Sequence, residues 1–286
     1  MATGFAVCYN LRGVWSAGKK SRILPSEGGE YNQGVGAGLR HLILSDIHSN
    51  LEALEKSLEL AEGKYDQVLC LGDLVGYGPD PNAVVERIRP LARVIVRGNH
   101  DKACSGLTDA EDFNYLARAA TEWTRTRLTP ENFEFLRDLP NGPVQVDGIE
   151  LVHGSPVDED EYIFDSLGAI EAFQSGPAPL VIFGHSHHQG GFLLTADKRL
   201  QSIPLPSIKD DVPASVALQE NARYLINPGS IGQPRDGDSR AAFAILDSGA
   251  SRIDFYRTTY DLVLTQEKMR EAGLPEPLVL RLEVGR

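Results

Sequence analysis

The chain has 286 residues, of which 42% are hydrophobic and 24% are charged, values ordinary for a globular protein with a buried core. No apolar run approaches the ~20 residues that span a bilayer, and a formal net charge of −12 argues against stable nucleic-acid binding. Three widely spaced cysteines predict neither a disulfide framework nor a thiolate metal site, so a reducing cytoplasm is the simplest location.

Residues 1–39 differ from the rest of the chain in composition. Residues 1–40 contain eight glycines, five Lys or Arg and two Glu, without a helical or alternating pattern. We predict a flexible N-terminal extension over residues 1–39, with a short strand near Phe5–Tyr9. An organelle transit peptide and an over-long predicted start are the alternatives for this segment.

Strands and helices alternate in the next segment. Short apolar runs predict strands at His41–Ser45, Gln67–Leu71 and Arg93–Val96. Apolar residues at helical spacing predict helices over Asn50–Glu62 and Pro81–Ile88. This βαβαβ order predicts a parallel sheet with right-handed crossovers.

A helical segment and a second series of strands follow. Helical patterns at Asn114–Arg127 and Pro130–Asp138 predict a cap over the site, at about residues 103–140. A second, largely antiparallel sheet is predicted beyond it, with a helix over Leu167–Phe173. Its strands are expected at Val144–Val146, Ile149–Val152, Leu180–Phe183, Phe192–Leu194, Val216–Leu218, Tyr224–Ile226, Phe243–Leu246 and Ile253–Tyr256.

The chain is predicted to end in a helix over Asp261–Ala272 and a short tail from Pro275 onward. The fold class is therefore α/β, with two mixed sheets packed face to face and helices outside them. We place one domain at residues 40–260 and a C-terminal helix and tail at residues 261–286.

Short polar motifs follow five of the predicted strands and hold five of the seven histidines. They are Asp46-Ile-His48, Gly72-Asp73, Gly98-Asn99-His100-Asp101, His153-Gly154 and Gly184-His185-Ser186-His187. Because the carboxyl ends of strands in open α/β sheets meet at one crevice, these loops can converge on one point. Residues two apart, such as Asp46 and His48, project to the same side where the chain is extended.

The motifs contain seven candidate metal ligands, too many for one tetrahedral zinc. They are Asp46, His48, Asp73, Asn99, His153, His185 and His187. This number fits two metals bridged by a carboxylate, and Asp73, alone in its loop, is the candidate bridge. A purely structural metal, which needs four ligands, is the alternative. Without thiolates, the ligands favour Mn, Fe, Co or Zn, with Mn first.

The net charge of such a centre favours phosphate as its ligand. Two divalent cations, two aspartates and a bridging hydroxide leave one positive charge in the site. A phosphate whose oxygens span metals ~3.5–4 Å apart is the natural anion for it. We predict that Asp101 holds the His100 imidazole and raises its pKa, so that His100 protonates the leaving alkoxide. A structural role for His100 is the alternative.

The ordered motifs resemble those of the calcineurin-like metallophosphoesterases, over about residues 40–257. Asn227-Pro228-Gly229-Ser230 is similar to a segment of the small bacterial and archaeal phosphodiesterase branch. The resemblance implies a four-layer α/β-β/α sandwich with a dinuclear site. It implies that Asp46, His48 and His187 hold one metal, that Asn99, His153 and His185 hold the other, that Asp73 bridges, and that His100 is the proton donor.

Differences from and similarities to the family motifs indicate which residues lie near the substrate. The Ser/Thr protein phosphatases of this superfamily carry phosphate-binding arginines beside these motifs, but no arginine follows Asp73 here and only Arg97 precedes Gly98. Residues 76–82 and 233–236 resemble a branch of broad-specificity phosphoesterases and indicate Tyr77 and Arg235. A surface ion pair for Arg235 and simple packing for Tyr77 are the alternatives.

The predicted function is hydrolysis of a small phosphodiester or phosphomonoester by direct attack of a hydroxide bound to two metals. The alternatives are a phosphoprotein phosphatase and a dinucleoside polyphosphate pyrophosphohydrolase. A metal-free interaction scaffold of the same fold comes third, because scaffolds of that kind lose ligands that are all present here. The sequence predicts no membrane partner and leaves the oligomeric state open.

Overall fold

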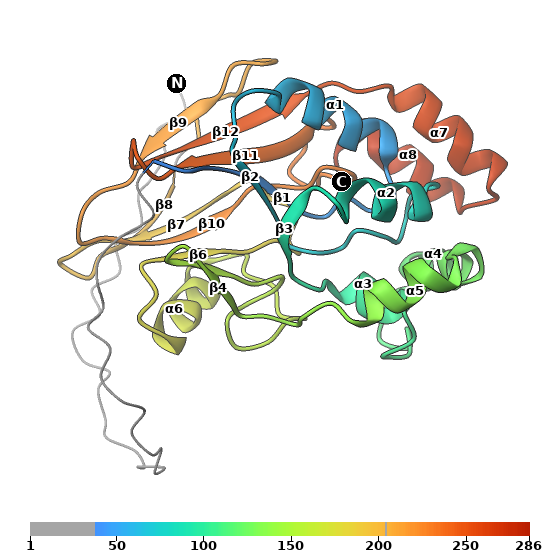
Figure 1. The fold of residues 1–286 in the computed structure, drawn as a ribbon, viewed down its shortest axis with the longest axis horizontal. Helices are drawn as coiled ribbons and strands as arrows, with labels where there is room; N and C mark the ends of the chain where they lie inside the picture. The colour runs from blue at the N-terminus through green and yellow to red at the C-terminus, as the bar shows by residue number, and fades with distance from the viewer. Residues whose placement is uncertain (1–37, 204) are drawn as a thin grey trace, which may run out of the picture.

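Two six-stranded sheets form the centre of the protein, and a computed structural model describes residues 38–203 and 205–286 (Figure 1). The first sheet has the order β3-β2-β1-β11-β12-β9, and the second has the order β4-β5-β6-β10-β7-β8. The strands of the first are β1 (Arg40–Leu44), β2 (Gln67–Cys70), β3 (Ala92–Ile95), β9 (Ala214–Ala217), β11 (Ala241–Asp247) and β12 (Arg252–Thr258). Those of the second are β4 (Val144–Val146), β5 (Ile149–Leu151), β6 (Leu180–Ile182), β7 (Gly190–Leu194), β8 (Leu200–Ser202) and β10 (Arg223–Asn227). The predicted strand near Phe5–Tyr9 lies outside the described residues.

Helices cover the outer faces of both sheets. In Figure 1, α1 lies over the first sheet, α6 lies under the second, and α3, α4 and α5 gather at one end. The helices are α1 (Leu51–Ala61), α2 (Pro81–Ile88), α3 (Asn99–Cys104), α4 (Tyr115–Arg127), α5 (Pro130–Arg137), α6 (Ser166–Ser175), α7 (Leu262–Glu271) and α8 (Glu276–Val284). Each helix of the described chain is too short or too polar to cross a lipid bilayer.

Successive side chains of the central strands point to opposite faces of their sheet and so pack in different layers of the fold. In β1, Leu42 and Leu44 pack in the cluster that includes α1 and α2, whereas Ile43 packs in the cluster between the two sheets. In β10, Leu225 packs against α6 and Ile226 faces the first sheet. A strand buried on both faces reads as a continuous apolar run, as the predicted strands do. The helix–sheet–sheet–helix order confirms the predicted four-layer sandwich.

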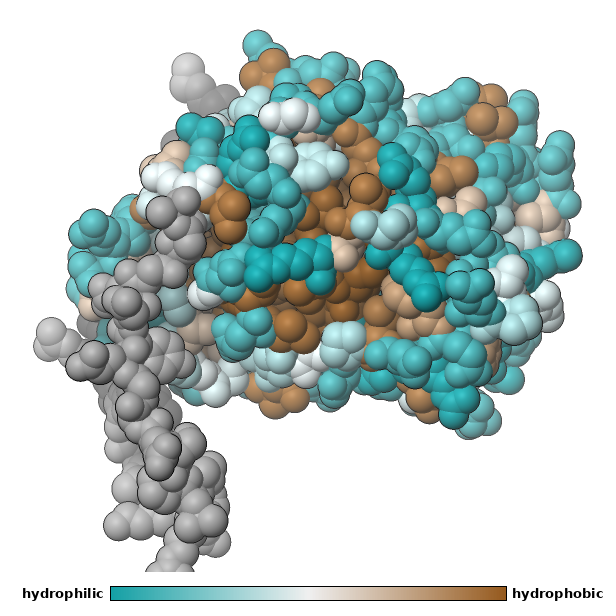
Figure 2. Space-filling model, in the orientation of Figure 1, coloured by the Kyte–Doolittle hydropathy of each residue, from teal (hydrophilic) through white to brown (hydrophobic). Residues whose placement is uncertain are grey.

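Figure 2 shows hydrophobic residues across the middle of the face viewed in Figure 1, surrounded by hydrophilic residues. The edge strands β3 and β4 lie on this face (Figure 1). Half-buried Val94 of β3 and Val144 of β4 pack at the border of the cluster between the sheets. The hydrophobic layers of the sandwich therefore reach the surface where the sheets end.

The prediction for the second sheet was wrong in its membership. Strands β9, β11 and β12 belong to the first sheet, because the free edge of β1 pairs antiparallel with β11 and places Ile43 opposite Ala244. The second sheet is mixed, with β5, β6 and β10 parallel at its centre. Strand β8, which is short and polar, was not predicted. Local apolar patterns identify a strand but carry no information on its neighbour.

The predicted C-terminal tail is also wrong, because α8 follows Pro275. Leu278 and Leu282 of this helix pack with Met269 of α7 and Ala120 of α4. Helix α3 was not predicted either, since six residues are too few to show a helical period. Helices α4 and α5 both pack against α3, so the helical segment lies beside the loop that carries Asn99 and His100.

Candidate metal centre

The ligand-bearing loops leave two sets of parallel strands at the same edge of the sandwich. Strands β1, β2 and β3 are parallel in the first sheet, and β5, β6 and β10 are parallel in the second. Backbone hydrogen bonds tie the loops to one another, including those from Asp46 N to Gly72 O (3.1 Å) and from Gly184 N to His153 O (2.8 Å). Loops distant in sequence thus form one continuous surface.

The prediction that residues two apart project to the same side required extended loops. The loops are not extended. Asp46, His48, Asp73, His185 and His187 all have left-handed backbones, with φ between 48° and 62°. This conformation is unfavourable for residues other than glycine, and its concentration at one site indicates a functional constraint. The side chains converge because the backbone coils tightly at each strand end.

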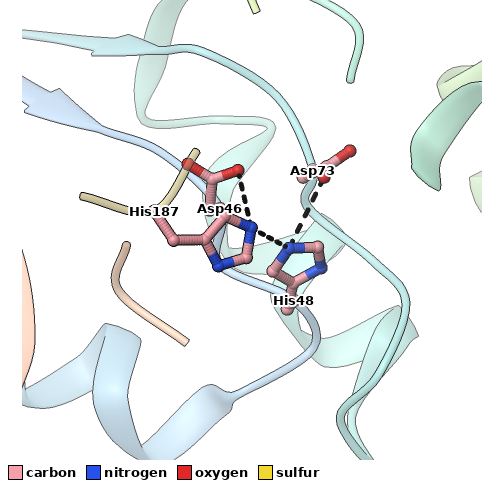
Figure 3. Close-up of side chains that lie close together, drawn as sticks. All are labelled: Asp46, His48, Asp73 and His187. Carbon is pink, nitrogen blue, oxygen red and sulfur yellow. Dashed lines mark hydrogen bonds and ion pairs between the residues drawn. The ribbon is translucent and has the colours of Figure 1, made fainter. Parts of the chain in front are cut away.

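The candidate ligands form two buried groups that share one carboxylate. The first group is Asp46, His48, Asp73 and His187, and the second is Asp73, His153 and His185. Figure 3 shows the first group, whose side chains point toward one another. The Asn99 side chain joins the second group, with Oδ1 at 3.2 Å from His153 Nε2.

Asp73 lies between the groups, and one of its two carboxylate oxygens makes no hydrogen bond within the described chain. Its Oδ1 accepts a hydrogen bond from His100 N (2.8 Å). Its Oδ2 is buried without a hydrogen-bond partner among the described residues, at 3.5 Å from His48 Nε2 and 3.4 Å from His153 Nε2. An unpartnered buried carboxylate oxygen facing both groups fits a bridging ligand.

In the first group, backbone carbonyls fix the imidazole tautomers. His48 Nδ1 donates to Val75 O (3.1 Å), and His187 Nδ1 donates to Gln233 O (2.5 Å). Each neutral ring has one proton, so both Nε2 atoms carry lone pairs, and they lie 3.1 Å apart. A cation held by both nitrogens would replace this repulsion with attraction, so the two rings fit a metal site.

The second group repeats the pattern. His153 Nδ1 donates to Leu71 O (2.8 Å), and His185 Nε2 donates to Asp160 O (3.1 Å), so their other nitrogens face inward, 3.1 Å apart. Burial lowers the pKa of His153, but the Asp73 carboxylate outweighs it and raises the pKa to about 10. The pair therefore requires a proton or a metal ion in this position.

The Asn227–Ser230 segment does more than turn the chain. The Asn227 side chain donates to Gly184 O (2.9 Å) and Ser186 Oγ (3.0 Å). Ser230 Oγ donates to Asp46 O (2.8 Å). These bonds join the loops after β1 and β6, so the segment positions candidate ligands of both sheets.

The predicted relation between Asp101 and His100 is wrong. Asp101 accepts hydrogen bonds from the backbone N–H groups of Leu74 (2.8 Å), Val75 (3.2 Å) and Gly98 (3.1 Å). Within the described chain, no hydrogen bond joins Asp101 to the His100 ring, whose Nδ1 is buried and unpartnered. Burial, only partly offset by Asp73, lowers the pKa of His100 to about 4. Asp101 instead holds the loops that carry Asp73 and Asn99.

The His100 ring occupies a closely fitted place beside the ligands. Its centroid lies 4.4 Å from that of Tyr77, 4.7 Å from that of Phe113 and 5.0 Å from that of His48. Gly76 has a φ of +90°, and a Cβ at that position would lie 2.5 Å from His100 Nδ1. Gly76 therefore allows both the turn and the approach of the ring.

The two arginines considered from the sequence differ in their surroundings. Arg97 is paired with Glu159 (2.9 Å). Arg235 Nη2 lies 3.0 Å from Gln233 Oε1 and 3.4 Å from the Tyr77 hydroxyl, and its buried Nε makes no hydrogen bond within the described chain. The partners of Arg235 shown here are neutral, so the alternative of a surface ion pair does not describe it.

One residue at the site was missed by sequence reasoning. The Tyr162 ring stacks on the His185 ring with centroids 3.7 Å apart and planes at 19°. It comes from the segment between β5 and α6, outside every motif, so no local signal marked it. The backbone acceptors Val75 O, Gln233 O and Asp160 O were equally invisible, because any residue supplies a carbonyl.

The fold and the centre define a four-layer α/β sandwich with a buried Asp and His cluster at its strand ends. Residues 39–250 match the calcineurin-like phosphoesterase superfamily domain, and the chain belongs to that family. It is 36% identical to an uncharacterized protein of Methanocaldococcus jannaschii over 256 residues, which are 85% of this chain and 97% of the relative.

Two solved structures are similar over most of the chain. A metallophosphoesterase from Sphaerobacter thermophilus is 40% identical, with a TM-score of 0.74, covering 87% of this chain and 100% of that one. A hypothetical protein from Pyrococcus horikoshii is 23% identical, with a TM-score of 0.67, covering 86% of this chain and 98% of that one. The second likeness concerns the fold alone.

Proposed function

We propose that the protein hydrolyses small phosphodiesters or phosphomonoesters with the help of two divalent metal ions. The observation that carries this proposal is the set of four inward-facing imidazole nitrogens around the unpartnered Oδ2 of Asp73. The His48 and His187 nitrogens repel each other, and the His153 and His185 nitrogens need a proton between them, so cations would stabilise both pairs. Nitrogen and oxygen ligands without thiolate favour Mn, with Fe, Co and Zn as further candidates. The buried free thiols of Cys70 and Cys104 agree with a reducing cytoplasm.

Each candidate ligand has a proposed role. Asp46, His48 and His187 would hold one ion, Asn99, His153 and His185 the other, and Asp73 both. When bound, the ions would polarise the phosphate and lower the pKa of an attacking water. His100 would transfer a proton to the leaving oxygen. The negative charges of Asp73 and of a bound phosphate favour its protonated form, against the effect of burial.

Arg235 and Tyr77, which lie beside the candidate ligands His187 and His48, would bind the phosphate. The half-buried guanidinium of Arg235 faces neutral partners, so its charge is available to an anion. Arg97, which is engaged by Glu159, does not offer a second arginine. Of the two arginines considered from the sequence, only Arg235 is free of an acidic partner within the described chain, which favours a small phosphoester over the phosphoprotein substrates of the Ser/Thr protein phosphatases.

The test is hydrolysis of bis-p-nitrophenyl phosphate and p-nitrophenyl phosphate by purified protein with Mn²⁺, Fe²⁺, Co²⁺ or Zn²⁺. We expect turnover with at least one metal and none after chelation. Elemental analysis of the same samples gives the metal content. Absence of turnover with every metal, together with absence of bound metal, would reject the proposal.

A further inference from the structure

Three aromatic rings lead from the candidate metal centre to the surface. The Tyr162 ring lies on His185, and the Phe164 ring lies parallel to Tyr162 with centroids 5.0 Å apart and planes at 10°. Exposure rises along this stack, from 3% for His185 to 43% for Tyr162 and 57% for Phe164. The stack thus begins at a candidate metal ligand and ends in solvent.

The segment that carries these rings is anchored on both sides. Ile163, between the two exposed rings, is buried in the cluster beneath α6. Asp165 Oδ1 accepts hydrogen bonds from Leu167 N (2.9 Å) and Gly168 N (3.1 Å) and so caps α6. On the other side, Asp160 O accepts the hydrogen bond of His185. The rings are therefore presented on fixed backbone, which lowers the conformational entropy lost when a ligand stacks on them.

Tyr162 belongs to the aromatic stack and also lies near the positive charge of Arg235. Burial raises the pKa of the Tyr162 hydroxyl, and the nearby positive charge of Arg235 opposes this rise. The guanidinium of Arg235 contacts the Tyr77 hydroxyl at 3.4 Å, and its charge acts on Tyr162. A ligand that reaches Arg235 with a phosphate group finds planar aromatic surface beside it.

We propose that Tyr162 and Phe164 form a subsite for the nucleobase of a nucleoside phosphoester. This inference rests on the proposed function, which places the phosphate at the metal centre. Parallel rings favour a planar aromatic group over an acyl chain, because a base continues the stack face to face. The Phe164 ring has no polar atom with which to read base edges, so the subsite accepts purines and pyrimidines alike.

The test compares binding of AMP and ribose 5-phosphate to Mn²⁺-loaded protein by calorimetry, in a His100→Ala background that slows turnover. We expect AMP to bind more tightly than ribose 5-phosphate. Phe164→Ala should weaken AMP binding about 5- to 150-fold, the range for loss of one base stack, and leave ribose 5-phosphate unchanged. Tyr115→Ala is the control, because Tyr115 is 81% exposed on α4, at the opposite side of Figure 1 from α6.

The outcomes separate this inference from the proposed function. Equal binding of the two ligands, or an unchanged AMP affinity in Phe164→Ala, overturns the subsite even if the protein hydrolyses phosphoesters. Preferential AMP binding that depends on Phe164 supports the subsite even if every phosphoester is left intact. A Phe164→Leu variant keeps the apolar volume and removes the planar ring. It should reproduce the loss, and normal AMP affinity in this variant also overturns the inference.

Discussion

The Nε2 atoms of His48 and His187 face each other at 3.1 Å, while both Nδ1 atoms donate to backbone carbonyls. Burial lowers the pKa of both rings well below the ordinary value, so neither nitrogen gains a proton at neutral pH. The contact is unfavourable unless a cation lies against both atoms. The metal-free protein thus contains a local repulsion that metal binding relieves.

Metal binding should therefore stabilise the fold. At a Mn²⁺ concentration 100 times the dissociation constant, we expect about 2.7 kcal/mol of stabilisation per site, or about 5.4 kcal/mol for two independent sites. For a protein of this size each site then raises Tm by about 5–10 °C. Differential scanning calorimetry with Mn²⁺ and with a chelator measures the difference. The same Tm in both conditions would contradict the prediction.

Loss of the shared carboxylate should affect both metals. Asp73→Asn removes the charge common to the two groups, so we expect the metal content after dialysis to fall from two ions per chain to below one. Asp197→Asn, which changes an exposed aspartate paired with Arg199, is the matched control and should keep both ions. Inductively coupled plasma mass spectrometry provides the measurement. Two ions in Asp73→Asn would remove Asp73 from the bridging position.

Gly76→Ala should impair catalysis without removing metal. The added Cβ would lie 2.5 Å from His100 Nδ1 and displace the ring, so we expect kcat to fall in the same direction as in His100→Ala. For His100→Ala the expected loss is about 10²–10⁴-fold, the range for a general acid.

Gly63→Ala isolates the backbone contribution to this effect. Gly63 has a φ of +72° with no atom within 4 Å of an added Cβ, so it reproduces the strain without the clash. We expect Gly63→Ala to lose stability and keep its kcat. Equal kcat values for Gly76→Ala and the wild type would show that the position of His100 is unimportant.

Asp101→Asn should act on stability more than on proton transfer. The carboxylate accepts three backbone N–H bonds, and the amide group of Asn turns a donor toward one of them. We expect a loss of about 1–3 kcal/mol in urea denaturation, the cost of one unsatisfied buried group. The pH profile of kcat should keep its shape. A shift of that profile without loss of stability would restore the direct link to His100.

Sequence patterns located the candidate ligands because each follows a strand whose apolar run is visible, as Asp46 follows Leu42–Leu44. They did not reveal which sheet β11 joins, because pairing Ile43 with Ala244 depends on residues 201 positions apart. The neighbour of Asp101 in the chain is His100, but its partners in space are backbone groups of the loop after β2. A hydrogen bond from a side chain to a backbone group requires no particular residue at the partner position. The sequence therefore does not reveal such a bond.

Strand β1 has consequences for the order of folding. It lies at the centre of the first sheet, and its neighbour β11 (Ala241–Asp247) comes near the end of the chain. During synthesis, the segment after β1 can form local helices and parallel pairs, but the edge of β1 stays open until β11 has been made. Contacts between distant segments slow folding, since loop closure must precede them. The loop bearing Asp46 and His48 therefore reaches its final support only when nearly the whole chain exists.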